Sequence, residues 1–365
     1  MGTVAFPKLK PLNEWNGDIK KPILIAGPCS AESPEQLLEV AKSLIQTQRV
    51  SFMRAGVWKP RTSPGSFEGF GTEALRWLRD VKSETEMPFA TEVGNGNHVY
   101  EALKYGADVL WIGARTVSNP FTIQEIASAL QGVDIPILVK NPLSTDLSLW
   151  IGSIGRLYNA GIHRIGAVHR GFTWWKKSTF RNQPFWKIPL ELKQQYPDLP
   201  VICDPSHISG DRKLVPLISR RAVDLGFDGL MVEVHPNPNC ALSDAEQQLT
   251  PHEFELMLKW IDVSTGEDQP YPDEMLSELR SEIDDMDEIL LWALSNRMEL
   301  SGKIASVKKQ TDLGVVQPVR WNKVLEKVTA AGLQSGLREK FILRLFSLIH
   351  EESIDVQKEK IGDKK

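Results

Sequence analysis

Cysteine is scarce in this sequence. Only three occur among 365 residues, at Cys29, Cys203 and Cys240. Three scattered thiols cannot all pair, which excludes a disulfide framework of the kind that holds small secreted proteins together. We expect reduced thiols, of which one or more is free to bind a metal ion.

Long apolar runs and a strong charge bias are also missing. No apolar stretch approaches the roughly 18 residues that a membrane span needs, and residues 1–21 contain no hydrophobic signal core. The net charge is -4 and the pI about 6.0, with no block of like charge that would indicate a nucleic-acid or membrane partner. With 41% apolar and 25% charged residues, we expect a cytoplasmic globular protein.

What the sequence does contain is a regular alternation of short apolar runs and amphipathic stretches. The predicted strands are 23–26, 50–53, 88–91, 109–112, 135–139, 164–168, 200–203 and 229–234. The predicted helices between them include 34–46, 72–83, 98–105, 122–130, 147–159 and 213–225. This pattern predicts an α/β fold, a (β/α)8 TIM barrel over residues 22–262 after an N-terminal arm over 1–21. A doubly wound open sheet is the alternative, but no Gly-x-Gly-x-x-Gly turn supports it.

The pattern changes after a polar linker at 263–272, and residues 273–365 are predicted to be helical. The first helix has over 30 residues and ends before Gly314, the second spans about 318–331 and the third 337–358. Two short helices cannot cover the apolar stripe of the first. Pairing with a second copy, giving a homodimer through the helices, is therefore expected.

Basic residues gather where the predicted strands end. The set comprises Arg54, Lys59, Arg61, Arg115, Lys140 and Arg170, with the hydroxyl of Thr62 beside them. In a barrel the carboxyl ends of the strands share one site. Six cations there would repel one another unless anions are bound, so we expect two phosphorylated groups, or a phosphate and a carboxylate. For the Lys-Pro-Arg triplet taken alone, a basic surface loop is the simpler explanation.

A second group at the strand ends consists of Cys29, His207, Glu233 and Asp244. One thiolate, one imidazole and two carboxylates suit a divalent transition metal. Each residue alone has a structural explanation, as a small buried side chain, a core histidine, a salt-bridge partner or a helix cap. Their joint position favours the metal site. His169 and His235 are expected to support this site or to contact substrate.

The motifs GPCS (27–30), RAGVWKPRTSPGSFEG (54–69), IGAR (112–115), DPSH (204–207) and MVEVHPNPNCALSD (231–244) resemble the 3-deoxy-D-arabino-heptulosonate-7-phosphate (DAHP) synthases. They are most similar to the compact type I beta-like subgroup, which also resembles the octulosonate-phosphate synthases. The resemblance implies a condensation of phosphoenolpyruvate with erythrose 4-phosphate that releases phosphate. The octulosonate-phosphate synthases are the alternative within this fold.

The same resemblance implies roles for individual residues. Cys29, His207, Glu233 and Asp244 would be the ligands of a divalent metal ion (Mn, Fe, Co or Zn) that acts on the aldehyde oxygen. Arg54, Lys59, Arg115, Lys140 and Arg170 would hold phosphoenolpyruvate, while Arg61 and Thr62 would hold the phosphate of erythrose 4-phosphate. Lys59 is also a candidate proton donor, with a pKa that we expect its cationic neighbours to lower.

The helical part carries cations beside its apolar stripe. Arg297 and Lys308 are 11 residues apart, three helical turns, and therefore share a face. Spacing alone leaves an interface salt bridge and an anion site equally open. The sequence of residues 273–360 resembles that of the all-helical chorismate mutases. This resemblance implies a role in substrate binding for Arg280, Arg297, Lys308, Arg320, Ser353 and Gln357.

In that family Lys308 and Gln357 would flank the ether oxygen of chorismate, and Arg280 would reach into the partner's site. Gln317 and Trp321 depart from the acidic residues that relatives often use to contact the substrate hydroxyl. The expected protein is a bifunctional, homo-oligomeric enzyme with feedback on the barrel; it is a homodimer through the helices, and the barrel family suggests a homotetramer. Two alternatives are a helical part that only senses chorismate or prephenate, and a structural dimerisation appendage.

Overall fold

The computed structural model describes residues 6–15, 22–60, 65–175, 178–263, 273–311, 314–315 and 317–362. Along the helices, side chains are not described at 13, 262–263, 273–282, 284–286, 288–289 and 292. The chain divides into two compact units, Met1–Glu267 and Asp268–Lys365.

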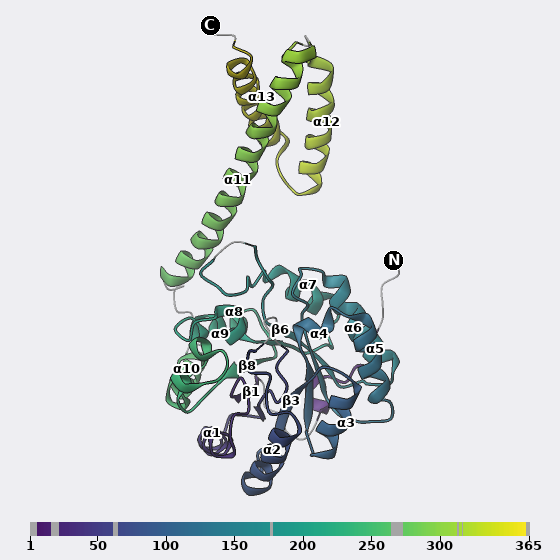
Figure 1. Ribbon diagram of the computed structural model, residues 1–365, viewed down its shortest axis with the longest axis vertical. Coiled ribbons are helices and arrows are strands. Elements are labelled where there is room, and N and C mark those ends of the chain that lie inside the picture. Colours follow the sequence, from purple (N-terminus) through teal and green to yellow (C-terminus); the bar gives the residue numbers. More distant parts are fainter. Residues whose placement is uncertain are drawn as a thin grey trace. The chain divides into compact units, whose positions relative to one another are not determined.

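The first unit is a closed barrel of eight parallel strands in the order of the sequence (Figure 1). The strands are β1 Ile23–Gly27, β2 Phe52–Arg54, β3 Phe89–Val93, β4 Val109–Ile112, β5 Ile137–Lys140, β6 Ile165–His169, β7 Val201–Cys203 and β8 Gly229–Glu233. Parallel β1–β8 pairing closes the barrel, with Ile23 opposite Gly229. The predicted fold class is confirmed, and the doubly wound alternative is excluded.

Helices surround this barrel and bury the outer face of its strands. They are α1 Pro34–Gln46, α2 Thr72–Thr85, α3 Gly96–Lys104, α4 Ala114–Val117, α5 Pro120–Ala129, α6 Leu147–Asn159, α7 Lys187–Gln195, α8 Pro205–Ser209, α9 Val215–Asp224 and α10 Pro251–Val263. The side chains of Ser33, Asn95, Asn119, Asp146 and Asp204 cap α1, α3, α5, α6 and α8. The short helices α4 and α8 follow strand ends directly, where they orient site residues.

The residues before β1, which we predicted to form an N-terminal arm, also contribute side chains to the core. Leu12 and Trp15 are buried with the inward-facing residues of the barrel, such as Ile23. The 3-10 helix η1, Leu12–Glu14, brings them there. The carbonyl of Trp15 accepts a hydrogen bond from Arg164, and a Cβ at Gly166 would lie 2.9 Å from the Trp15 ring. This segment therefore fills the interior of the barrel, and glycine at 166 makes room for the indole.

The second unit consists of three helices, α11 Asp273–Thr311, α12 Pro318–Gln334 and α13 Glu339–Ile361. Helix α13 packs against both α11 and α12. Apolar side chains stay exposed along α11: Ile283, Leu290, Leu291, Leu300, Ile304 and Val307. The predicted length of the first helix agrees with α11. Among the described helices, none combines the length and apolar character needed to cross a membrane.

Candidate active sites

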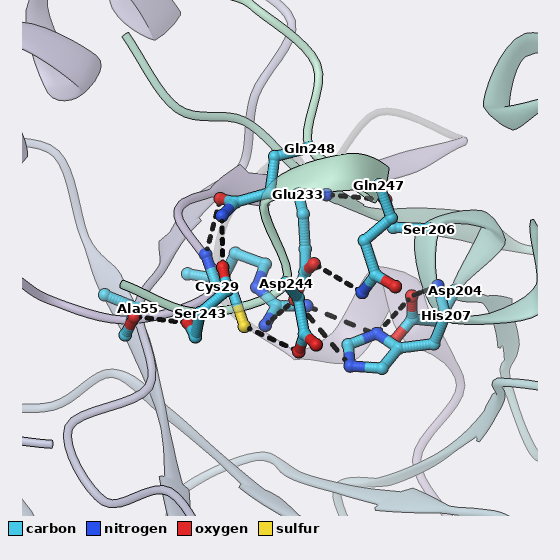
Figure 2. A network of polar contacts seen from close by, with 12 residues as sticks. Cys29, Ala55, Asp204, Ser206, His207, Glu233, Ser243, Asp244, Gln247 and Gln248 are labelled. Carbon is cyan, nitrogen blue, oxygen red and sulfur yellow. Dashed lines mark hydrogen bonds and ion pairs between the residues drawn. The ribbon is translucent and has the colours of Figure 1, made fainter. Parts of the chain in front are cut away.

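Three potential metal ligands meet at the carboxyl end of the barrel. Cys29 follows β1, Glu233 ends β8, and Asp244 precedes the 3-10 helix η3, Ala245–Gln247. Their ligand atoms all lie within 4.8 Å of one another, and the Cys29 sulfur is 3.2 Å from Asp244 Oδ2. Figure 2 shows these side chains converging from segments far apart in the sequence.

The fourth predicted ligand, His207, lies beside this cluster without belonging to it. Its Nε2 is 3.7 Å from Glu233 Oε1. Its Nδ1 is 3.0 Å from Asp204 Oδ1, and the Asp204 side chain also caps α8 by accepting from the His207 backbone N–H. A carboxylate on one ring nitrogen leaves the other available to a metal ion.

The charges of the cluster fit a divalent cation. The Cys29 thiol is buried; this burial and the nearby Glu233 carboxylate raise its pKa to about 12. Burial raises the pKa of Asp244, but His207 and Arg181 outweigh it, and the pKa lies well below its usual range. A bound cation would stabilise the thiolate against the same carboxylates. One sulfur, one nitrogen and two oxygens form a donor set that several transition metals accept.

The predicted cations do not simply repel one another, because buried carboxylates lie between them. Arg54 Nη2 is 3.0 Å from Glu233 Oε1, and Lys140 Nζ is 2.7 Å from Asp204 Oδ2. The prediction that only bound anions could balance these charges is therefore wrong. Sequence position could not reveal the compensation, because Asp204 begins a motif that we interpreted through His207 alone.

Lys59 also differs from the prediction. Its Nζ donates to the Cys29 carbonyl at 2.9 Å and lies 3.0 Å from the Cys29 sulfur. Burial lowers the pKa of Lys59, but Cys29 and Glu92 outweigh it, so the pKa is raised rather than lowered. The effects of Cys29, Glu92 and Glu233 on this pKa are each larger than that of Arg54, the cation that lowers it.

A pocket opens over this network. It is lined by four predicted cations, Lys59, Arg115, Lys140 and Arg170, together with Glu92, Arg181, His207 and Asp244. Burial lowers the pKa of Arg170 to about 10, with Arg181 and Arg115 adding to the shift. Arg54 lies deeper, fully buried under the pocket. Arg61 and Thr62 lie outside the described residues, so their predicted contact with phosphate stays a prediction.

Sequence reasoning missed Arg181, Glu92 and Gln247. Arg181 follows the end of β6 by 12 residues, in a segment without apolar periodicity, where a rule based on strand ends finds nothing. The expectation that His169 supports the metal site or contacts substrate is wrong, because its ring lies elsewhere. Its ring packs against Phe172 and Trp186, outside the barrel, and burial lowers its pKa to about 3.

The helical unit brings a second set of predicted residues together. Arg297 of α11 donates to the Ile349 carbonyl at 3.2 Å and to the Ser353 hydroxyl. Lys308 Nζ donates to the Val315 carbonyl at 2.6 Å. Gln357 is buried, and its Oε1 has no described hydrogen-bond partner. The partners of both cations named here are neutral.

Two further aromatic residues lie at this set. Trp321 stacks on His350, with ring centroids 3.9 Å apart and planes at 5°. Burial, with Arg297 and Lys308 nearby, lowers the pKa of His350. Sequence analysis did not find His350, which comes one helical turn before Ser353.

One predicted substrate ligand, Arg320, is not joined to this set in the described part of the helices. Arg320 is exposed near the start of α12, as is Gln317. The side chain of Arg280 lies outside the described residues.

The sequence of this chain matches two known protein families. The DAHP synthetase I family matches residues 7–267. The chain belongs to the DAHP synthetase I family. In this family member, residues 279–358 match a second family, chorismate mutase type II. Both resemblances are confirmed: the chain carries a DAHP synthase domain followed by a chorismate mutase domain.

Individual relatives agree with the family. A phospho-2-dehydro-3-deoxyheptonate aldolase of Thermotoga maritima is 36% identical over 233 residues, which cover 64% of this chain and 66% of that protein. A 2-dehydro-3-deoxyphosphooctonate aldolase of Desulfatibacillum aliphaticivorans is 30% identical, over 67% of this chain and 93% of its own. A crystal structure of the Thermotoga aldolase, a DAHP synthase, aligns with a TM-score of 0.62 and 32% identity, over 71% of this chain and 77% of its own.

Proposed function

We propose that the barrel condenses phosphoenolpyruvate with erythrose 4-phosphate to give DAHP and inorganic phosphate. The observation that carries this proposal is one pocket lined by Lys59, Arg115, Lys140 and Arg170 directly above a buried Cys29–Glu233–Asp244 cluster. Four cations suit the phosphate and carboxylate of an anionic enol substrate. The match to the DAHP synthetase I family supports the same reaction.

The chain's own residues can perform distinct tasks in this reaction. Arg115, Lys140 and Arg170 orient the phosphoenolpyruvate through its charged groups, which brings its enol carbon to the aldehyde. Lys59 has a raised pKa and is protonated at neutral pH, so it can donate a proton to the new alkoxide. A divalent metal ion (Mn, Fe, Co or Zn) held by Cys29, Glu233, Asp244 and His207 would supply Lewis-acid chemistry.

We propose that the helical unit rearranges chorismate to prephenate. Arg297 and Lys308 supply positive charge for the substrate dianion, and Gln357 presents a buried amide beside the predicted position of the ether oxygen. A pericyclic rearrangement needs no covalent catalysis. Holding the reactive shape and stabilising charge on that oxygen suffice.

Assays of the metal-loaded protein test both activities. Consumption of phosphoenolpyruvate with erythrose 4-phosphate, and of chorismate in a separate reaction, is the expected result. Arabinose 5-phosphate serves as the competing substrate. Its preferential use would assign the barrel to octulosonate synthesis, and unchanged chorismate would reduce the helical unit to a binding module.

We propose that the helical unit acts as a homodimer in which Arg280 of one chain completes the site of the other, with a homotetramer as the alternative assembly. The exposed apolar residues of α11, such as Leu290 and Leu291, supply a surface for a second copy. Arg280→Ala and Lys308→Met should each abolish chorismate turnover. Mixed by refolding together, they should recover about a quarter of the activity, because half of the dimers then hold one intact site of two. No recovery would contradict the shared site.

Feedback on the barrel by the helical unit is a separate proposal. Its support is the presence of both domains in one chain. Prephenate should lower the rate of DAHP synthesis. In the Lys308→Met variant, which should not turn over chorismate, a lower rate of DAHP synthesis after addition of chorismate would show that binding alone is sufficient. Equal synthase rates with and without prephenate would contradict the regulation and leave both activities standing.

A further inference from the structure

Each of the two carboxylates of the metal-ligand cluster accepts a hydrogen bond from Arg181 or Gln247, and Glu233 is also held by Arg54 Nη2 at its other oxygen, Oε1. Arg181 Nη1 donates to Asp244 Oδ1 at 2.9 Å. Gln247 Nε2 donates to Glu233 Oε2 at 2.7 Å. Arg181 Nη1 also donates to Gln247 Oε1, at 2.7 Å. The side chains therefore form one continuous chain, Asp244–Arg181–Gln247–Glu233, which we call the brace.

The brace decides which carboxylate oxygens face the site. With Oδ1 committed to Arg181, Asp244 turns Oδ2 toward the Cys29 sulfur, 3.2 Å away. With Oε2 committed to Gln247, Glu233 turns Oε1 toward Arg54 Nη2, 3.0 Å away, and toward His207 Nε2, 3.7 Å away. One oxygen of each carboxylate is thus left pointing at the other potential ligands, and Figure 2 shows Gln247 beside Glu233 in this position.

The backbone at this point also needs support. Asp244 has φ 47° and ψ 43°, the left-handed region that few non-glycine residues adopt. The neighbouring Gln248 ties the same segment to the first ligand, because its Oε1 accepts from the Cys29 backbone N–H at 3.0 Å. A contact that fixes the Asp244 side chain therefore also opposes relaxation of its backbone.

We propose that Arg181 and Gln247 are positioning residues that set the metal affinity of the barrel site by fixing the ligand oxygens of Asp244 and Glu233. This inference rests on the metal site of the proposed function. Residues that hold metal ligands from outside typically contribute 10- to 100-fold in affinity. Arg181 has a competing role, since it lines the pocket with Arg115 and Arg170 and could instead hold a substrate phosphate.

Metal binding without substrate separates these roles. Co²⁺ affinity is measured by competition with a chromophoric chelator, and the thiolate-to-cobalt charge-transfer band reports the geometry at Cys29. Arg181→Ala and Gln247→Leu should each weaken binding by about 10-fold or more and shift the band. Arg181→Lys should restore most of the affinity, because an ammonium can donate to both acceptors.

Arg212 provides a matched control. Its Nη2 donates to the Ala245 carbonyl, so it contacts the same segment without touching Asp244 or Gln247. Arg212→Ala should leave the affinity and the band unchanged. If it weakens binding as much as Arg181→Ala does, the effect belongs to folding of the segment and the proposal is wrong.

Three other outcomes would also overturn the proposal. Unchanged Co²⁺ affinity in Arg181→Ala with a raised KM for phosphoenolpyruvate would make Arg181 a substrate ligand. Equal affinity in all variants would show that the ligands need no brace, while the metal site itself stands. A wild-type protein that binds no Co²⁺ would instead remove the metal site, and the brace with it.

Discussion

The barrel site and the helical site handle positive charge in opposite ways. In the barrel, Arg54 and Lys140 are paired with Glu233 and Asp204, and all four side chains are nearly inaccessible. In the helical unit, the described hydrogen bonds of Arg297 go to a carbonyl and a hydroxyl. One site balances its own charges, whereas the other leaves positive charge available to a ligand.

This difference bears on what each site needs before it can work. Buried opposite charges are rigid and ordered without a substrate, because any displaced partner would be left unpaired in a medium of low polarity. Cations whose partners are neutral gain most when an anion arrives. We therefore expect the barrel site to be sensitive to loss of its own carboxylates and the helical site to loss of its cations.

Asp204→Asn should have the largest effect, because it leaves buried Lys140 unpaired and releases His207. We expect DAHP synthesis to fall by at least about a thousandfold and the barrel to lose about 3–5 kcal/mol of stability. Urea denaturation followed by tryptophan fluorescence measures the second quantity. Asp211→Asn, at an exposed site, is the control.

The pH dependence of stability tests the same pair. Burial alone would raise the pKa of Asp204, but His207 and Lys140 hold it well below its usual range. Its stabilisation is therefore present above the unfolded pKa of about 4 and is lost as the pH falls through the folded value. Acid should thus narrow the gap between wild type and Asp204→Asn. A gap that stays constant from pH 7 to pH 3 would contradict the assignment.

Lys308→Met tests the other half of the comparison. Removing one group that stabilises charge in the transition state costs about 10²- to 10³-fold in kcat, and we expect this loss for chorismate. Stability should hardly change, since the lost hydrogen bond goes to a carbonyl. Lys303→Met, an exposed residue paired with Glu299, is the control. A large loss of stability in Lys308→Met would mean that this site also depends on internal pairing.

Metal binding to the barrel should release a proton, because the Cys29 thiol has a pKa raised to about 12 and must lose its proton to become a ligand. Apparent affinity should therefore rise with pH, by about tenfold per unit for each proton released. Calorimetry in buffers of different ionisation enthalpy counts the protons. An affinity independent of pH would show that the thiol is not a ligand.

Trp321→Ala should have the smallest effect. Aromatic pairs contribute about 0.5–1.5 kcal/mol, so losing the stack on His350 should raise the KM for chorismate by about 2- to 10-fold. Trp321→Phe, which keeps a ring, should stay near wild type. A fall in kcat instead of a rise in KM would place this pair closer to the reacting atoms than the stack suggests.

The sequence predicted the barrel, its eight strands and the three terminal helices, because apolar periodicity records burial directly. Helices α1 and α6 have the predicted bounds. It did not predict α4, α7, α8 or α10, or the burial of Trp15. A single indole before the first strand carries no pattern.

For the site, strand ends and motifs led to the residues that line the pocket, but not to their partners. Pairing of Lys140 with Asp204 and of Asp244 with Arg181 joins residues more than 60 positions apart. The direction of the Lys59 pKa shift depends on Cys29, Glu92 and Glu233, so the prediction failed there. The predicted domain boundaries at 262 and 273 stay predictions.

The buried position of Trp15 has a consequence for how the protein is made. The indole lies among residues that include Val168, Ile202 and Met231, so its pocket is complete only when the last strand is available. During synthesis at 5–20 residues per second, that delay is roughly 10–45 s. Trp15 therefore leaves the ribosome well before the strand that completes its pocket, and its indole stays in contact with water until that strand is made. Throughout that interval, the Trp15 indole would be accessible to chaperones that bind nascent chains.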